Sequence, residues 1–133
     1  RDDVYFLFGF TNDFYKHPRI IHYPPFCDEN FKTKFINTCD AMLHARSMGE
    51  SFGLAIAEFS SKNKPIITLK GGNDQAHLNM LGNNALYYND YDSALDILIS
   101  FNKSLLDNDW DMYSEKYNPQ AVMNKFKEVF IDV

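Results

Sequence analysis

Short apolar runs along the chain predict strands. The runs are rich in Val, Ile, Leu and aromatic residues, as is typical of strands buried on both faces of a parallel sheet. Pro24 and Pro25 close the second run, because proline cannot continue a strand interior. The predicted strands lie at residues 4–9, 20–23, 41–44, 65–69 and 85–88.

Between these runs, apolar residues recur at the spacing of amphipathic helices. This spacing predicts helices after Asp28, from Phe52 to about Ser61, near 74–81, near 94–101 and from Pro119 onward. The residues that stand where helix caps are expected are Asp28, Ser51, Asp90 and Asn118. The acidic stretch 105–117 has no period that assigns it to a helix or a strand.

Strands of about five residues that alternate with helices indicate an α/β fold. We predict a Rossmann-like open parallel sheet with helices on both faces, in a single domain over residues 1–133. Such sheets bind ligands at the carboxyl ends of their strands. A binding site is therefore expected in the loops after Gly9, Tyr23, His44 and Leu69.

Size and charge narrow the possible functions. A chain of 133 residues with 45% hydrophobic content is long enough for one hydrophobic core. Its formal net charge of -5 gives no basic excess for phosphate backbones or anionic lipid, so no nucleic acid is expected as a partner. The 23% charged content and scattered glycines and prolines indicate that the whole chain folds.

Cellular location is predicted from targeting patterns and cysteines. No apolar run approaches the roughly 18 residues of a membrane span, and the start does not resemble a signal peptide. Cys27 and Cys39 match no disulfide framework or zinc pattern, so we expect reduced thiols, no metal site and a cytoplasmic protein. Because the chain begins at Arg1 and soon enters an apolar run, we expect a piece of a longer protein.

Residues 39–58 form the most informative stretch, a strand that ends in a polar loop and opens into a helix. The unpaired amides and dipole of a helix start favour phosphate or hydroxyl oxygens, and Gly53 lets a ligand approach the backbone. Glu50 stands just before the helix and Glu58 about two turns inside it, which places both on one side, about 12 Å apart along the axis. Together they could hold two ends of one elongated ligand.

A structural interpretation of the same residues stays open on spacing alone. Glu50 would cap the helix, and Glu58 would pair with a nearby Lys or Arg.

Residues Glu50–Glu58 read E-S-F-G-L-A-I-A-E, which resembles the E-x7-E motif of family 4 retaining glycosyltransferases of the GT-B fold. In its commonest form this motif begins E-G-F-G. The surrounding order is also similar, with Asp40 before an apolar strand and N-K-P-I-I-T at 63–68 as the strand that follows. The resemblance covers most of the chain and implies the C-terminal, donor-binding half of such an enzyme.

This resemblance implies roles for the two glutamates. Glu50 would be the catalytic residue that holds hydroxyls of the transferred sugar, and Glu58 would accept hydrogen bonds from the nucleotide ribose. Such enzymes transfer a sugar from a UDP- or GDP-type nucleotide sugar with retention of configuration. They generally need no metal ion or other cofactor, and an N-terminal domain that binds the acceptor completes them.

The resemblance also implies donor contacts for loops and backbone. The base would lie against the loop after the second predicted strand, at Tyr23 and Pro25, with Gly9 beside it. The amides that would hold sugar hydroxyls and the distal phosphate are those of Ser51, Phe52, Gly53 and Leu54.

The chain departs from the family pattern in two ways. Ser51 replaces the commoner glycine, which leaves the amide in place. The strand and glycine loop that open the family's donor half, and the Arg or Lys pair that it supplies to the diphosphate, do not appear ahead of Val4. Arg46 would contact phosphate or pair with Glu50. His44, at the expected ligand edge, would be a catalytic or a hydrogen-bonded structural residue.

We therefore expect a hexosyltransferase donor domain that is inactive when isolated, because the acceptor domain and phosphate cations are absent from it. Two rivals remain. A catalytically silent domain of the same fold would serve binding or assembly. A GT-B enzyme of another chemistry, such as a phosphorylase or a nucleotide-sugar epimerase, would carry a pyridoxal-binding Lys or turn over without an acceptor.

Overall fold

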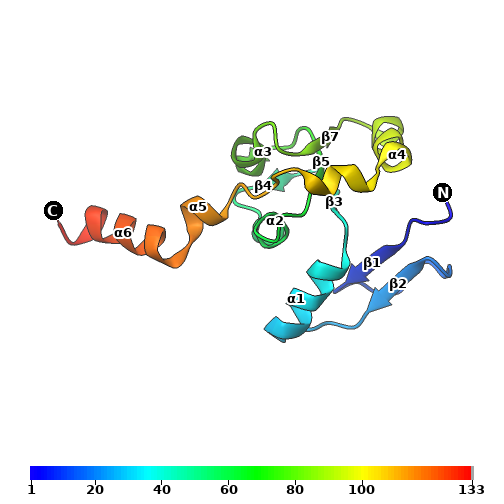
Figure 1. Cartoon of the computed structure of the whole chain (residues 1–133), viewed down its shortest axis with the longest axis horizontal. Helices are drawn as coiled ribbons and strands as arrows, with labels where there is room; N and C mark the ends of the chain where they lie inside the picture. The colour runs from blue at the N-terminus through cyan, green and yellow to red at the C-terminus, as the bar shows by residue number, and fades with distance from the viewer. Residues whose placement is uncertain (133) are drawn as a thin grey trace. The chain divides into compact units, whose positions relative to one another are not determined.

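A computed structural model describes residues 1–132 and divides the chain after Cys39 into two compact units (Figure 1). All strand pairs in the described residues are parallel, apart from an isolated bridge between His17 and Ile20. Parallel strands that alternate with helices confirm the predicted α/β, Rossmann-like fold. The single domain over 1–133 stays a prediction, because the division does not show which units fold independently.

The N-terminal unit contains the elements that the sequence predicted there. β1 (Phe6–Gly9) pairs in parallel with β2 (Ile20–Tyr23), and α1 (Glu29–Thr38) follows. The Asp28 side chain caps α1 by accepting from the Phe31 amide at 2.7 Å, as predicted.

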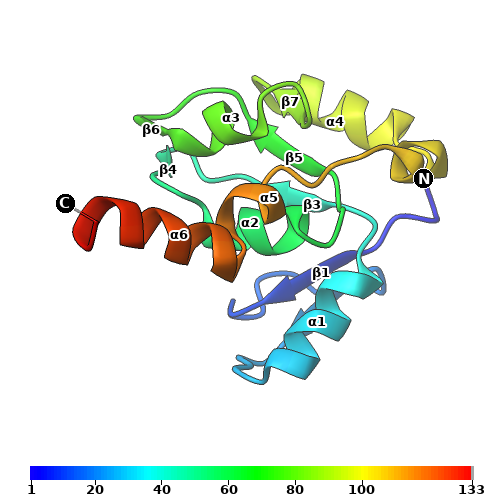
Figure 2. The ribbon, with the colours of Figure 1, turned by 60° about the vertical axis from the view of Figure 1, so that its left-hand side comes forward.

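The C-terminal unit is built on a parallel sheet in the order β3-β5-β7. Its strands are β3 (Met42–His44), β5 (Ile66–Leu69) and β7 (Leu86–Tyr88), all within the predicted runs. A separate parallel pair joins β4 (Gly49–Glu50) to β6 (Asp74–Gln75), which the apolar pattern did not predict. Figure 2 shows this pair beside the start of α3.

The helical elements of the C-terminal unit are α2 (Leu54–Ser60), α3 (Ala76–Leu81), α4 (Tyr91–Ser100), the 3-10 helix η1 (Lys103–Asp107), α5 (Ser114–Tyr117) and α6 (Pro119–Phe130). Helix α2 packs on β3 and β5, and α4 on β7 (Figure 2). No helix within residues 1–132 has the length and apolar character needed to cross a membrane.

The helix caps of this unit agree with prediction except at α2. Asp90 caps α4 and Asn118 caps α6 through their side chains. The prediction that Ser51 caps α2 was wrong, because Gly53 occupies the N-cap in a left-handed conformation with φ 82°. The helix consequently begins at Leu54 rather than Phe52, and Ser51 lies outside it.

Hydrogen bonds anchor the stretch that the sequence left unassigned. The buried core joins α2, β5 and α3 to this stretch through Ile56, Ile66, Leu81 and Tyr113. The Ser60 hydroxyl donates to the Trp110 carbonyl at 2.7 Å and accepts from the Met112 amide at 3.0 Å. A side chain of α2 thus fixes the backbone that precedes α5.

Candidate functional site

His44, the last residue of β3, is buried within a hydrogen-bonded cluster of the C-terminal unit. Its Nδ1 lies 2.9 Å from the Thr68 hydroxyl of β5, and its Nε2 lies 3.3 Å from a carboxylate oxygen of Glu50 in β4. The Tyr88 hydroxyl of β7 donates to the His44 carbonyl at 3.0 Å. The cluster therefore lies at the carboxyl ends of the parallel strands, where the sequence placed His44.

The partners of His44 determine where its protons lie. A carboxylate can only accept, so His44 Nε2 carries the proton that is donated to Glu50. In the neutral imidazole, Nδ1 then accepts from the Thr68 hydroxyl.

The Glu50 carboxylate also accepts from Arg46. One guanidinium nitrogen lies 3.2 and 3.1 Å from its two oxygens. Burial alone would raise the pKa of Glu50, but the hydrogen bonds from His44 and Arg46 outweigh burial and hold the pKa below its ordinary value. Glu50 is therefore ionised at neutral pH, with 21% of its side chain exposed.

Arg46 pairs with Glu50 from the solvent side, which is one of its two predicted roles. Its side chain is 62% exposed, so the ion pair contributes about 1 kcal/mol or less. Glu50 can therefore exchange Arg46 for another donor at small cost. Contact between Arg46 and a phosphate stays a prediction.

His77 is a further member of the cluster that the sequence analysis missed. It lies in α3, is 1% exposed, and accepts through Nδ1 from the Glu50 backbone N–H at 3.3 Å. Its ring meets the His44 ring edge to face, with centroids 5.2 Å apart. Burial lowers the pKa of His77, which favours the neutral imidazole, and acceptance from the Glu50 amide through Nδ1 places the remaining proton on Nε2. No local motif signals this contact, because it depends on the pairing of β4 with β6.

Two glycines allow β4 and its neighbouring backbone to approach closely. Gly49 has φ 79°, and a Cβ there would lie 1.9 Å from the Asp74 carbonyl oxygen. Gly72 has φ 99°, and a Cβ there would lie 2.8 Å from the Gly49 nitrogen. Only glycine fits either position. This close approach fixes the backbone immediately before Glu50.

The helical arrangement assumed for the two glutamates does not extend to Glu50, and their separation stays a prediction. Glu50 lies in β4, and the left-handed Gly53 separates it from α2. The helical rise that placed the carboxylates about 12 Å apart on one side therefore does not apply between them. Glu58 lies within α2, as predicted, and is half-buried. Its predicted contact with a ribose stays a prediction.

The predicted oxyanion-binding segment leads into a short helix. α2 spans seven residues, and no side-chain cap bonds to its first amides. Leu54 is 74% exposed, whereas Phe52 packs edge to face on Tyr113 with ring centroids 5.5 Å apart. Contact of phosphate or sugar with the amides of Ser51, Phe52, Gly53 and Leu54 stays a prediction.

The predicted base-binding residues lie in the N-terminal unit. Gly9 is opposite Tyr23 in the β1–β2 register. A Cβ on Gly9 would lie 2.9 Å from the Phe26 ring, so the glycine makes room for that ring. Pro25 is exposed, and the Tyr23 ring packs edge to face on Phe35 at 5.4 Å. Contact of a nucleotide base with these residues stays a prediction.

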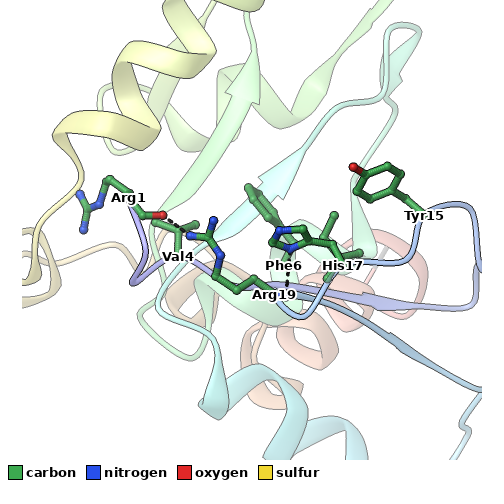
Figure 3. A pocket seen from close by; sticks show the side chains of 7 residues that line it. Arg1, Val4, Phe6, Tyr15, His17 and Arg19 are labelled. Atoms are coloured by element: carbon green, nitrogen blue, oxygen red, sulfur yellow. Dashed lines mark hydrogen bonds between the residues drawn. The ribbon is translucent and has the colours of Figure 1, made fainter.

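Two hollows occur within residues 1–132. One of about 250 Å³ in the N-terminal unit is lined by basic, aromatic and aliphatic side chains, namely Arg1, Val4, Phe6, Tyr15, His17, Arg19 and Ile20 (Figure 3). Another of about 410 Å³ in the C-terminal unit is lined by Lys70, Gly71, Gln75, Leu78, Asn79, Gly82, Asn83 and Tyr87. The second hollow includes Lys70 and Gly71 of the loop after Leu69, where the sequence predicted a binding site, but neither lining includes a residue assigned to the donor by the resemblance.

No known protein family, curated protein or solved structure matches the chain. Within residues 1–132, no group of three or more His, Cys, Asp or Glu side chains is arranged to hold a metal ion. The geometry offers an ionised carboxylate, oriented by an imidazole and an exposed guanidinium, at the carboxyl edge of a parallel sheet.

Proposed function

We propose that the chain is the donor-binding domain of a retaining glycosyltransferase, in which Glu50 holds hydroxyls of the transferred sugar. The observation that carries this proposal is the Glu50 carboxylate, which is ionised, partly exposed and oriented at the carboxyl ends of parallel strands. Hydrogen bonds from hydroxyls to a carboxylate are charge-assisted and short, which suits a site for a polyol. The resemblance of the Glu50–Glu58 segment to the E-x7-E motif supports the same assignment.

The neighbours of Glu50 have complementary roles in this proposal. The His44 imidazole donates to one carboxylate oxygen and keeps the side chain oriented. Arg46 leaves Glu50 when the donor binds and contacts its diphosphate. This exchange replaces one charge-assisted hydrogen bond by another, so it costs little. The remaining partners are a UDP- or GDP-type nucleotide sugar and an N-terminal acceptor-binding domain of the same enzyme.

Calorimetry with matched ligands tests the role of Glu50. We expect Glu50→Gln to lower the affinity for a nucleotide sugar about tenfold or more, since a charged acceptor is lost. Affinity for the corresponding nucleoside diphosphate should stay nearly unchanged. A chelator should change neither affinity, because the proposed contacts involve no metal ion.

The matched control is Glu128→Gln, which removes an exposed carboxylate from α6, where it pairs with Lys125 at 3.0 Å. This control should bind both ligands as the wild type does. Failure of the wild type to prefer any UDP or GDP sugar over its nucleoside diphosphate would overturn the proposal. So would equal sugar affinity in Glu50→Gln and the wild type.

A catalytically silent domain is the second candidate, and one observation favours it. Arg46 and His44 provide the Glu50 carboxylate with partners from within the chain. If this is their whole role, Glu50→Gln should lower the midpoint of thermal unfolding without changing the binding of any nucleotide sugar. The same variant therefore separates the two functions.

A further inference from the structure

We propose that His77 is a positioning residue, which fixes the backbone of Glu50 so that its carboxylate stays beside His44 and within reach of a bound sugar. The part that concerns the sugar rests on the proposed function of Glu50. The part that concerns the backbone rests only on contacts within the C-terminal unit.

His77 and the other members of the cluster hold different ends of Glu50. His77 accepts from the Glu50 amide through Nδ1, at 3.3 Å. His44 and Arg46 donate to the carboxylate. Because β4 is only two residues long, few ladder hydrogen bonds constrain this backbone otherwise. The bond from α3 therefore supplies a constraint that the short strand lacks.

The burial of His77 supports a polar role. A buried imidazole is costly unless its nitrogens are hydrogen-bonded, so an apolar side chain would fill a purely structural position more favourably. The titratable groups that face His77 are His44, across the edge-to-face ring contact, and Glu50. Neutral His77 with the proton on Nε2 is the form that can accept from an amide.

Two variants separate the hydrogen bond from the packing. His77→Asn places an amide oxygen close to the position of Nδ1, whereas His77→Leu fills similar space without an acceptor. We expect nitrogen NMR of the full chain to show an unprotonated Nδ1 on His77. The Glu50 amide should exchange with solvent about tenfold faster in His77→Leu than in the wild type, and His77→Asn should restore its protection.

Either of two results would overturn the positioning role. One is a protonated Nδ1 on wild-type His77 at neutral pH. The other is equal exchange of the Glu50 amide in the wild type and His77→Leu. Should His77→Leu fail to fold, His77→Gln replaces it, because its longer side chain places the acceptor near Nε2 instead. If the Glu50 amide is protected from exchange in His77→Asn but not in His77→Gln, the positioning role is supported. Equal protection of this amide in both variants contradicts it.

Calorimetry tests the functional part separately. His77→Leu should lose most of the preference for a nucleotide sugar over its nucleoside diphosphate, about tenfold, while His77→Asn keeps it. If the NMR results hold but the wild type has no such preference, the proposed function fails and the positioning role stands. If Glu50→Gln abolishes the preference and His77→Leu does not, the positioning proposal fails alone.

Discussion

Glu50 is constrained at both its main chain and its side chain. His77 holds its amide, and His44 and Arg46 hold its carboxylate. Sequence reasoning found His44 and Arg46 because both lie within six residues of Glu50 along the chain. It missed His77, because that contact joins residues that are distant along the chain. Local capping rules likewise predicted that Asp28 caps α1. They failed at Ser51, because the left-handed Gly53 occupies the N-cap of α2.

The lowered pKa of Glu50 predicts a loss of stability in acid. Its carboxylate is favoured in the folded state, so its contribution is fully present above the pKa of the unfolded chain, ordinarily 4.5. That contribution is lost as the pH falls through the lower folded value. The free energy of unfolding, measured by urea titration between pH 6 and 3, should therefore fall more steeply for the wild type than for Glu50→Gln. Parallel curves would contradict the prediction.

Glu58 should affect a different part of the donor from Glu50. Glu58→Gln removes a charged acceptor from the proposed ribose contact, which costs about 1.5 to 3 kcal/mol, or roughly tenfold to a hundredfold in nucleotide affinity. The effect should shrink for a 2′,3′-dideoxy nucleotide, which lacks both hydroxyls. Calorimetry with both nucleotides measures the difference. Wild-type affinity in Glu58→Gln, with an unchanged circular dichroism spectrum, would favour the structural interpretation of this residue.

Among the elements, the longer ones follow the sequence pattern and the shortest do not. The apolar runs predicted β3, β5 and β7 because each is part of a buried sheet. β4 and β6 are two residues long, too short for any periodicity to appear. η1 and α5 escaped prediction because side-chain bonds to backbone, such as that from Ser60 to Trp110, hold their stretch in place.

The close approach at Gly49 predicts a strong effect of one added methyl group. Gly49→Ala would place a Cβ 1.9 Å from the Asp74 carbonyl oxygen at a φ of 79°. We expect the free energy of unfolding to fall by about 3 kcal/mol or more, since strain and overlap add. Gly82→Ala is the matched control, with φ 55° and nothing within 4 Å of the added Cβ.

Gly82→Ala should cost only the backbone strain of a positive φ, about 1 to 3 kcal/mol, without any steric overlap. Urea titration of both variants gives the comparison. Equal losses would show that the contact between Gly49 and Asp74 is not as tight as described.

Tyr113 predicts a loss of stability in alkali. It is buried, and its hydroxyl donates to the Phe52 carbonyl at 3.1 Å. Burial raises the pKa of Tyr113 from 10.0 to about 12. The folded state therefore keeps the proton where the unfolded chain loses it. Stability should be unaffected by this group below pH 10 and should fall as the pH rises through about 12.

The loss attributable to Tyr113 should approach about 3 kcal/mol. Tyr113→Phe cannot ionise at this position, so its free energy of unfolding should fall less between pH 9 and 11.5 than that of the wild type. Urea titration across that range measures both slopes. Equal pH slopes for the wild type and Tyr113→Phe would show that another group causes the loss of stability.

At the scale of the whole molecule, the predicted alternation of strands and helices determined the fold class but not the division after Cys39. The connection between α1 and β3 is short and carries no run of Gly, Pro or Ser that would mark a linker. The pattern of apolar positions predicts alternating strands and helices in both units alike. A boundary between such units therefore leaves no trace in that pattern.

The division predicts that the C-terminal unit folds without the N-terminal unit. The core residues Ile56, Ile66, Leu81 and Tyr113, and the Glu50 cluster, all lie in the C-terminal unit. We expect residues 40–133, expressed alone, to unfold cooperatively, because they contain their own core. They should also keep the proposed preference for a nucleotide sugar over its nucleoside diphosphate, because the Glu50 cluster lies within them. Urea titration and calorimetry of this fragment measure the two properties. Failure of 40–133 to fold would favour one domain over 1–133, whereas a folded fragment without the preference would contradict a donor site built on Glu50.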